Sequence, residues 1–220
     1  MPRPSAASRV RTVKASPAAL RRLRGTDPVM ARLVDEHATL VRRELEQERL
    51  GDAYGALLRS IVGQQLSTKA AATIYGRMIE IFGGHAPSPR QLLEADPDAI
   101  RAAGLSRPKI AYLRDLAVHV EQGALELDRL PELPDEEVVA QLTAIKGLGE
   151  WTAHMFLMFH LRRPDILPVG DQGIRRAVQA EYRLRKPPER ERLEKLARPW
   201  RPHRTLACLL LWSSLDNKPA

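Results

Sequence analysis

The turn Lys146-Gly147-Leu148-Gly149 joins two stretches of sequence with helical periodicity. Backbone N–H groups in such a turn, and in the first turn of the next helix, have no partner within a helix. Because the two glycines carry no side chain, a phosphate oxygen can approach these amides closely, and the helix dipole attracts it. The candidate phosphate-binding residues are Lys146, Gly147, Leu148, Gly149 and Thr152. The alternative is that the glycines only close a hairpin of two helices.

A single carboxylate, Asp171, stands at the predicted start of a helix, at the end of the loop Leu167-Pro168-Val169-Gly170-Asp171. A lone carboxylate can stabilise a developing positive charge or orient a water molecule, so Asp171 is our candidate catalytic residue. The alternative is that Asp171 is a plain N-cap. Its nearest competitor, Asp165, follows a proline outside this pattern, and we expect it to be a solvated loop residue.

The elements that must position these residues are helices, since helical periodicity runs along nearly the whole chain and no run alternates as a strand does. We therefore predict an all-α fold. The expected helices cover about 27–49, 53–82, 88–95, 97–103, 106–122 with Ser106 as cap, 135–143 with Asp135 as cap, and 150–160, followed by three that begin after Asp171, near Glu189 and near Pro202. The segment 53–82 is either one helix or two helices separated at Gly63-Gln64-Gln65.

Charge is distributed unevenly over the 220 residues. Residues 1–26 carry a net charge of +7, residues 27–149 of −5 and residues 150–220 of +6, so a polyanion such as a nucleic acid has two places to bind. Residues 1–16 are rich in Pro, Ser and Arg, and we expect a mobile basic tail there. The longest apolar stretch is too short to cross a bilayer, and no signal sequence is recognisable, which indicates a soluble cytoplasmic protein. One cysteine, Cys208, excludes a disulfide framework and any four-cysteine metal site.

Four stretches, taken together, resemble a known family. They are the turn Ile145 to Ala153, the loop Leu167 to Arg176, the segment Leu58 to Ser67, and the segments Trp200 to Arg204 and Leu211-Trp212. Their order and types resemble the helix-hairpin-helix (HhH-GPD) DNA glycosylase superfamily, and within it the 3-methyladenine DNA glycosylase II (AlkA-like) branch in a compact form. The resemblance implies two helical lobes with an active-site cleft between them. Residues 17–52 plus 150–220 would form the lobe that carries the aspartate, and 53–149 a helical barrel closed by the hairpin at about 135–160.

The resemblance implies a monofunctional glycosylase that flips alkylated, cationic bases such as 3-methyladenine and 7-methylguanine out of DNA and hydrolyses the N-glycosidic bond. Branches that also cut the DNA backbone carry a lysine just after the hairpin, where this sequence has Trp151, and an indole cannot form an imine. Such an enzyme would initiate base excision repair without a cofactor. Two alternatives stay open: a glycosylase for uracil or oxidised purines, and a catalytically silent hairpin module that only binds DNA.

The resemblance also places a base pocket and a wedge. Trp151 and Trp212 match pocket positions, where an aromatic face can hold a cationic base, and Tyr54 is a further candidate from its helical position. Met155 and Ser213 stand where some relatives have aromatic residues, which leaves the lesion range open. Gln64, Gln65 and Leu66 match the segment that fills the space of the flipped nucleotide, and Gln65 or Leu66 is our candidate for the wedge itself.

No side-chain metal site is expected, because the six histidines show no ligand spacing. The resemblance does suggest a monovalent cation at the carbonyl groups of Ile145 and Gly147. The expected partner is double-stranded DNA containing alkylated bases, bound by a monomer in the cytoplasm, at the nucleoid, with no membrane involved.

Overall fold

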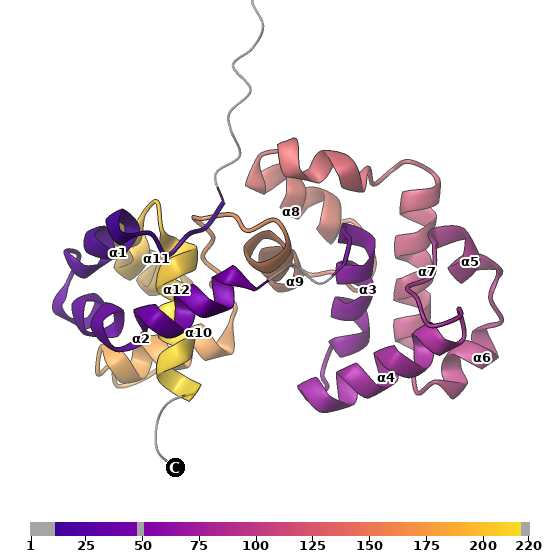
Figure 1. Cartoon of the computed structure of the whole chain (residues 1–220), viewed down its shortest axis with the longest axis horizontal. Helices are drawn as coiled ribbons and strands as arrows, with labels where there is room; N and C mark the ends of the chain where they lie inside the picture. The colour runs from indigo at the N-terminus through magenta and orange to yellow at the C-terminus, as the bar shows by residue number, and fades with distance from the viewer. Residues whose placement is uncertain (1–11, 48–50, 217–220) are drawn as a thin grey trace, which may run out of the picture. The chain divides into compact units, whose positions relative to one another are not determined.

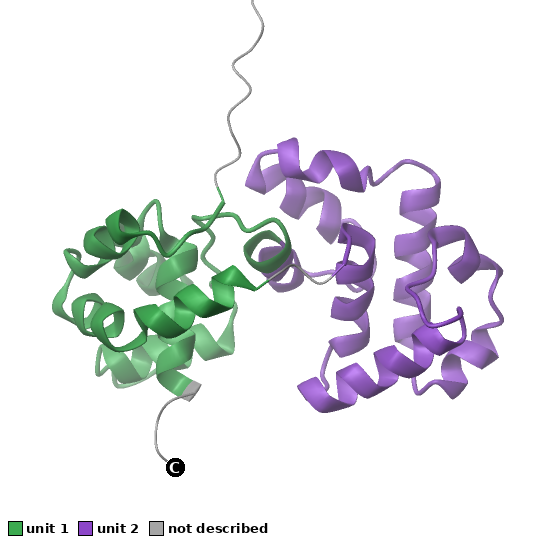
Figure 2. Cartoon of the chain, in the orientation of Figure 1, with its two compact units in different colours: residues 1–48, 157–220 green, residues 49–156 purple. Residues whose placement is uncertain are grey.

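The computed structural model describes residues 12–47 and 51–216, and every regular element within these ranges is a helix (Figure 1). The prediction of an all-α protein is therefore confirmed. The chain divides into two compact units (Figure 2): unit 1 takes the residues up to 48 and from 157 onward, and unit 2 takes residues 49–156. This division differs from the predicted one, which ended the inserted lobe at residue 149, because the helix that follows the glycine turn is assigned to unit 2.

Unit 1 is built around its last helix. Its elements are α1 (Pro17–Arg24), α2 (Pro28–Glu46), a π-helix (Phe156–His160) that begins at the boundary, α10 (Gln172–Glu181), α11 (Arg190–Ala197), a 3-10 turn (Arg198–Trp200) and α12 (Arg204–Asp216). Helix α12 packs against α2 and α10, and α1 packs against α2. The run from Leu206 to Leu211 in α12 is buried, so the longest apolar stretch of the sequence forms the core of this unit.

Unit 2 is built around α3 and α7. Its elements are α3 (Ala53–Gly63), α4 (Thr68–Glu80), α5 (Pro89–Glu94), α6 (Pro97–Ala102), α7 (Arg107–Glu121), a 3-10 helix (Leu127–Glu132), α8 (Asp135–Thr143) and α9 (Glu150–Met155). Helix α3 packs against α4 and α7, α5 packs against α7, and α8 packs against α9. Of the two possibilities for residues 53–82, the structure has two helices, separated at the three residues that follow Gly63 and by the cap Ser67.

Helix starts are fixed by proline and by capping side chains, as the sequence predicts. The side chains that accept a backbone N–H at a helix start are those of Ser16, Asp27, Asp52, Ser67, Ser88, Asp96 and Asp171. Ser106 is the N-cap residue of α7, as predicted, although its side chain makes no cap hydrogen bond. The prediction of Asp135 as a cap was wrong. Asp135 is the first residue of α8 after the N-cap Pro134, where its charge interacts with the helix dipole instead.

The predicted mobile tail needs a correction at residues 12–16. Val13 and Ala15 are buried, the Val13 N–H donates to the Arg162 carbonyl at 2.6 Å, and Ser16 caps α1. This short segment is therefore packed on unit 1, because its two apolar side chains find a place in the core that the Pro- and Arg-rich composition does not reveal. The rest of the predicted tail, residues 1–11, lies outside the described residues.

Candidate functional site

Asp171 is a buried N-cap that also binds a tryptophan. Its Oδ1 accepts the backbone N–H of Ile174 at 2.7 Å, which caps α10, and accepts the indole N–H of Trp212 at 3.1 Å. The residue is only 9% exposed. The two interpretations of Asp171, cap and functional carboxylate, therefore do not exclude each other: the cap fixes its position, and the indole donor comes from a different helix.

Arg175, one helical turn after Asp171, is bonded elsewhere. The Arg175 Nε donates to the carbonyl of Pro188 at 2.9 Å, and its guanidinium pairs with Glu189 at 3.4 Å. Asp165, the competing carboxylate, lies 2.8 Å from the Arg204 Nε and holds the start of α12. Asp165 is thus a structural residue rather than the solvated loop residue that we expected, since its charge is paired within unit 1.

An aromatic pair lies beside Asp171. The rings of Trp212 and Phe159 are stacked, with centroids 5.9 Å apart and planes at 26°, and Phe159 is 52% exposed. Sequence reasoning missed Phe159, because it placed residues 150–160 on one regular helix. In the structure Phe156–His160 is a π-helix, whose wider turn changes the direction of each side chain. The available signal was a phenylalanine in an apolar run near a predicted site, which is too weak to single it out.

Gly173 leaves the space that lets Trp212 reach Asp171. A Cβ built on Gly173 would lie 2.8 Å from the indole nitrogen of Trp212 and 3.0 Å from Asp171 Oδ1. Both distances are far below ordinary contact, so a side chain here would push the indole away from the carboxylate. The glycine of the Asp171-Gln172-Gly173 sequence is therefore required by packing against α12.

In unit 2 the glycine turn is held by contacts with α7. Gly147 adopts φ +83°, and a Cβ on it would lie 2.3 Å from the ring of Tyr112. The Lys146 N–H donates to Asp115 Oδ2 at 2.9 Å, while its Nζ lies 3.6 Å from the other oxygen of that carboxylate and is largely exposed. The backbone amide of Lys146 is therefore used inside the protein, and only its side chain is left for a phosphate.

The other predicted phosphate ligands differ in what they offer. Within the described residues, the backbone N–H groups of Gly147 and Gly149 donate to no protein acceptor, and a Cβ on Gly149 would meet open space. The Leu148 N–H donates to Ile145 at 3.1 Å, and Thr152 is buried. The two glycine amides, which have no protein acceptor within the described residues, and the exposed Lys146 ammonium are thus the groups available to an anion.

At the α3–α4 break, Gln65 is exposed to solvent, whereas Gln64 is hydrogen-bonded to the glycine turn. Gln64 donates its side-chain N–H to the Gly147 carbonyl at 2.6 Å. Gln65 has φ +58°, a left-handed conformation uncommon for a residue with a side chain, and its side chain is exposed. Leu66 is also exposed. The two carbonyls predicted to bind a cation both accept hydrogen bonds, Gly147 from Gln64 and Ile145 from Leu148.

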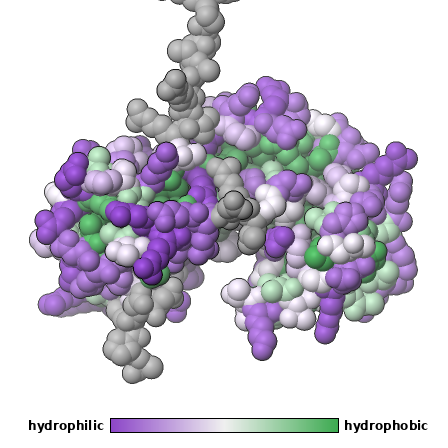
Figure 3. All heavy atoms as spheres, in the orientation of Figure 1, coloured by the Kyte–Doolittle hydropathy of each residue, from purple (hydrophilic) through white to green (hydrophobic). Residues whose placement is uncertain are grey.

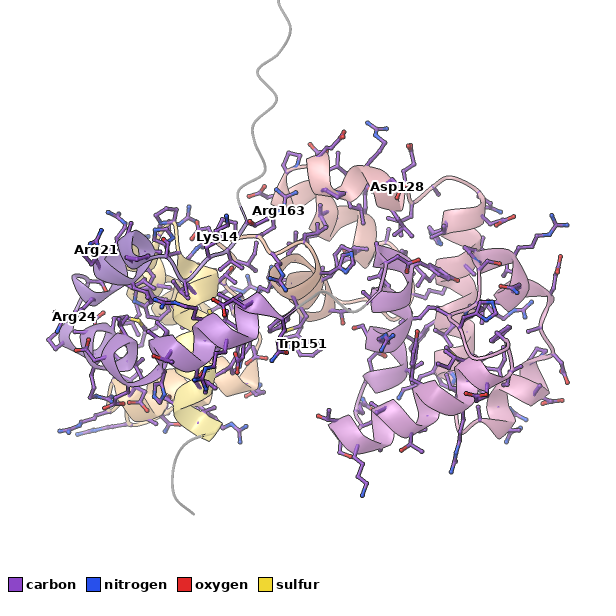
Figure 4. All side chains as sticks on the ribbon, in the orientation of Figure 1. Lys14, Arg21, Arg24, Asp128, Trp151 and Arg163 are labelled. Atoms are coloured by element: carbon purple, nitrogen blue, oxygen red, sulfur yellow. The ribbon has the colours of Figure 1, made fainter. Side chains whose placement is uncertain are left out.

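The remaining pocket candidates differ in how far they are exposed to solvent. Trp151 is 46% exposed in the first turn of α9, and its ring projects from the helix (Figure 4). Tyr54 is 7% exposed, and burial raises the pKa of its hydroxyl, so its ring belongs to the core of unit 2 and offers no face to a base. Ser213 is buried and donates to the Leu209 carbonyl, so it does not line an open pocket, whereas Met155 is half-buried.

Each unit presents a largely hydrophilic surface on the face seen in Figure 3. The exposed large apolar side chains include Trp151 and Phe159, the two aromatic residues described above. No group of three or more metal-ligating side chains occurs over residues 12–47 and 51–216, and no helix in those ranges has the length and apolar character to span a bilayer.

The chain is similar to proteins of one family. The model of the HhH-GPD superfamily of base excision DNA repair proteins matches residues 58–202. DNA-3-methyladenine glycosylase 1 of Schizosaccharomyces pombe is 35% identical over 165 residues, which are 74% of this chain and 72% of that protein. A Bacillus subtilis relative, 30% identical, is longer, and the chain spans 59% of its length.

Two solved structures share the fold at substantial identity. The S. pombe 3-methyladenine DNA glycosylase, in complex with abasic DNA, has a TM-score of 0.76 and 31% identity, over 90% of this chain and 97% of that one. The DNA-3-methyladenine glycosidase of Bacillus halodurans has a TM-score of 0.79 and 34% identity, over 94% and 93% of the two chains.

Proposed function

Because the chain belongs to the HhH-GPD superfamily of base excision DNA repair proteins, we propose that it is a DNA glycosylase that excises alkylated bases such as 3-methyladenine and 7-methylguanine. The observation that carries the proposal is the Asp171 carboxylate, buried and held by its own helix and by Trp212. The names of the similar proteins support the same class of substrate.

The chemistry asks little of the protein beyond one negative charge. An alkylated purine is already cationic, so when the bond between the sugar C1′ and the base nitrogen breaks, the electron pair neutralises the base and no acid is needed. Positive charge then develops on the sugar, and water adds to C1′ and loses a proton. A carboxylate fixed in place before the reaction stabilises that charge without reorganising, and Asp171 has this character.

An aromatic face would bind the extruded base. In unit 1, Phe159 and Trp212 form a stacked pair beside Asp171. In unit 2, Trp151 on α9 has an exposed indole and is a separate candidate for this contact. Each favourable contact of a cationic base with an aromatic face is worth about 0.5–2 kcal/mol. Since Trp151 has no amine, no side chain at this position can form an imine with the sugar, and we propose hydrolysis without strand cleavage.

Unit 2 would bind the DNA backbone and insert a wedge side chain into the duplex. The two glycine amides of the hairpin and the Lys146 ammonium suit a backbone phosphate. Of the two glutamines, Gln65 suits the wedge better, because it is exposed in a left-handed conformation, whereas Gln64 is tied to Gly147; Leu66, which is also exposed, stays a candidate. A protein that repairs chromosomal DNA works where that DNA lies, so we also propose that it associates with the nucleoid.

The variant Asp171→Asn tests the proposal, because an asparagine oxygen can still accept both hydrogen bonds while the charge is lost. We expect binding to methylated duplex DNA to persist and formation of abasic sites to fall by at least about 100-fold. Asp96→Asn makes the same exchange at another N-cap, that of α6, and should leave excision unchanged. Equal product from Asp171→Asn and the unchanged protein would remove Asp171 from the mechanism. No product from the unchanged protein on oligonucleotides carrying alkylated, uracil or oxidised lesions would favour a module that only binds DNA.

A further inference from the structure

Helix α7 directs three side chains of one face at the two loops that we assign to DNA. Lys109, Tyr112 and Asp115 are spaced three residues apart, so they lie along one side of the helix. We call these residues the α7 face. Each contacts either the α3–α4 break at residues 64–66 or the glycine turn at residues 146–149, and all of these segments belong to unit 2.

Lys109 fixes the end of α3. Its Nζ donates to the carbonyl of Val62 at 2.8 Å and to the carbonyl of Gln64 at 2.7 Å. The last carbonyls of a helix have no partner within it and carry its negative dipole end, so an ammonium group satisfies both their hydrogen bonding and their charge. Burial also lowers the pKa of Lys109. The left-handed Gln65 follows directly after the bonded carbonyl.

Tyr112 and Asp115 fix the glycine turn, one by packing and the other by accepting a hydrogen bond. The Tyr112 ring lies where a side chain of Gly147 would be, and Asp115 accepts the Lys146 N–H. The two loops also contact each other, because Gln64 donates to the Gly147 carbonyl at 2.6 Å. The three segments therefore contact one another in pairs. Lys109 of α7 binds the α3–α4 break, the break binds the glycine turn, and the glycine turn contacts Tyr112 and Asp115 of α7.

We propose that the α7 face joins the wedge segment and the phosphate-binding turn into one rigid block, and that Lys109 is a positioning residue for the wedge. The roles of the two loops rest on the proposed function; the coupling between them does not. In such a block, binding of a DNA phosphate at the turn sets the position of Gln65 in the duplex, so the wedge enters at a fixed distance from the gripped phosphate. In this proposal Lys109 acts through the backbone carbonyls that it holds.

Hydrogen exchange of the protein without DNA tests the coupling. The N–H groups of Leu66 and Leu148 are both hydrogen-bonded, one in each loop, and serve as probes. Lys109→Met removes a contact to the first loop only, and Asp115→Ala removes a contact to the second loop only. We expect each variant to speed exchange of both amides, by roughly tenfold for the loss of a charged hydrogen bond. Arg114→Met is the matched control on α7, since the hydrogen bond of Arg114 within the described residues goes to the Ala95 carbonyl and not to either loop, and it should speed neither.

Each other outcome of the exchange experiment decides against the proposal. If a variant speeds exchange in its own loop alone, the loops are independent and the block does not exist. If neither amide responds to Lys109→Met, the two Lys109 hydrogen bonds do not hold the break. Lys109→Arg keeps a donor at this place and should restore slow exchange, and thermal melting of all variants excludes general unfolding.

Single-turnover excision then tests the positioning role. With a normal base opposite the lesion, Lys109→Met should slow excision by roughly tenfold at saturating protein. A pyrene nucleotide opposite the lesion fills the vacated space by itself, so it should restore the Lys109→Met rate but not the Asp171→Asn rate. A slow Lys109→Met rate that pyrene does not restore, or an unchanged rate without pyrene, would overturn the positioning role. If the unchanged protein excises nothing, the proposed function fails while the exchange result still decides the coupling.

Discussion

Replacing Gly173 with alanine adds one methyl group at the point where Trp212 meets Asp171. The new carbon would lie 2.8 Å from the indole nitrogen, so to reach ordinary contact the indole must retreat by about 0.6 Å, which lengthens its 3.1 Å hydrogen bond past the limit of a real one. A hydrogen bond to a charged group is worth about 1.5–3 kcal/mol. If Trp212 holds the carboxylate for catalysis, excision should slow by about 10- to 100-fold.

Stability should change much less than the rate. Overpacking costs about 1–3 kcal/mol, but alanine recovers about 1 kcal/mol of helix propensity in α10. Single-turnover excision of 7-methylguanine and thermal melting measure the two effects separately. Gly170→Ala is the control, because a methyl group there meets nothing within 4 Å. Full activity of Gly173→Ala, or an equal loss in the control, would refute the assignment of Trp212 as the partner that positions Asp171.

Three further substitutions test other contacts. Gly147→Ala should lower the free energy of unfolding by about 2–4 kcal/mol, because its methyl group meets the Tyr112 ring and its φ is +83°; adding Tyr112→Ala should restore part of the loss in chemical denaturation. Trp212→Phe keeps a ring but removes the N–H that Asp171 accepts, so single-turnover excision should slow by about tenfold while DNA affinity changes little. Burial lowers the pKa of His203 from 6.5, so the unfolded chain takes up the proton first as pH falls. The free energy of unfolding should therefore decrease as the pH falls through about 6.5, and His203→Gln should flatten that decrease.

Helix positions were predictable because their signals are local. Proline at the first position and an oxygen-bearing cap mark where α2 and α5 begin, and these lie within a few residues of each other in the sequence. Ser106 stands at the N-cap of α7 with the same extended backbone as Ser88 but makes no side-chain cap hydrogen bond, and Asp135 lies one position after the N-cap of α8, so the residue type alone does not fix a cap. The prediction of a mobile tail was wrong at residues 12–16 because their packing is not a local property. Val13 bonds to the Arg162 carbonyl, which lies far away along the chain.

The residues of the candidate site also differ in whether local sequence signals identify them. Asp171, Trp212 and the glycine turn belong to short patterns, so they could be named from the sequence. Phe159 required knowledge of a π-helix, which hydrophobic periodicity does not reveal. The contacts of Lys109 with Val62 and of Gly173 with Trp212 join residues about 40 or more positions apart, and only the folded chain brings them together.

The chain order of the two units bears on when the protein becomes active during its synthesis. Unit 2 is one uninterrupted stretch, whereas α2 packs on α12, which the ribosome makes much later. Domains fold as they emerge, so the hairpin and its supporting helices can form while unit 1 is still incomplete. Asp171 gains its indole partner only when α12 has left the exit tunnel. Under the proposed function, a nascent chain would therefore bind DNA before it is able to excise a base.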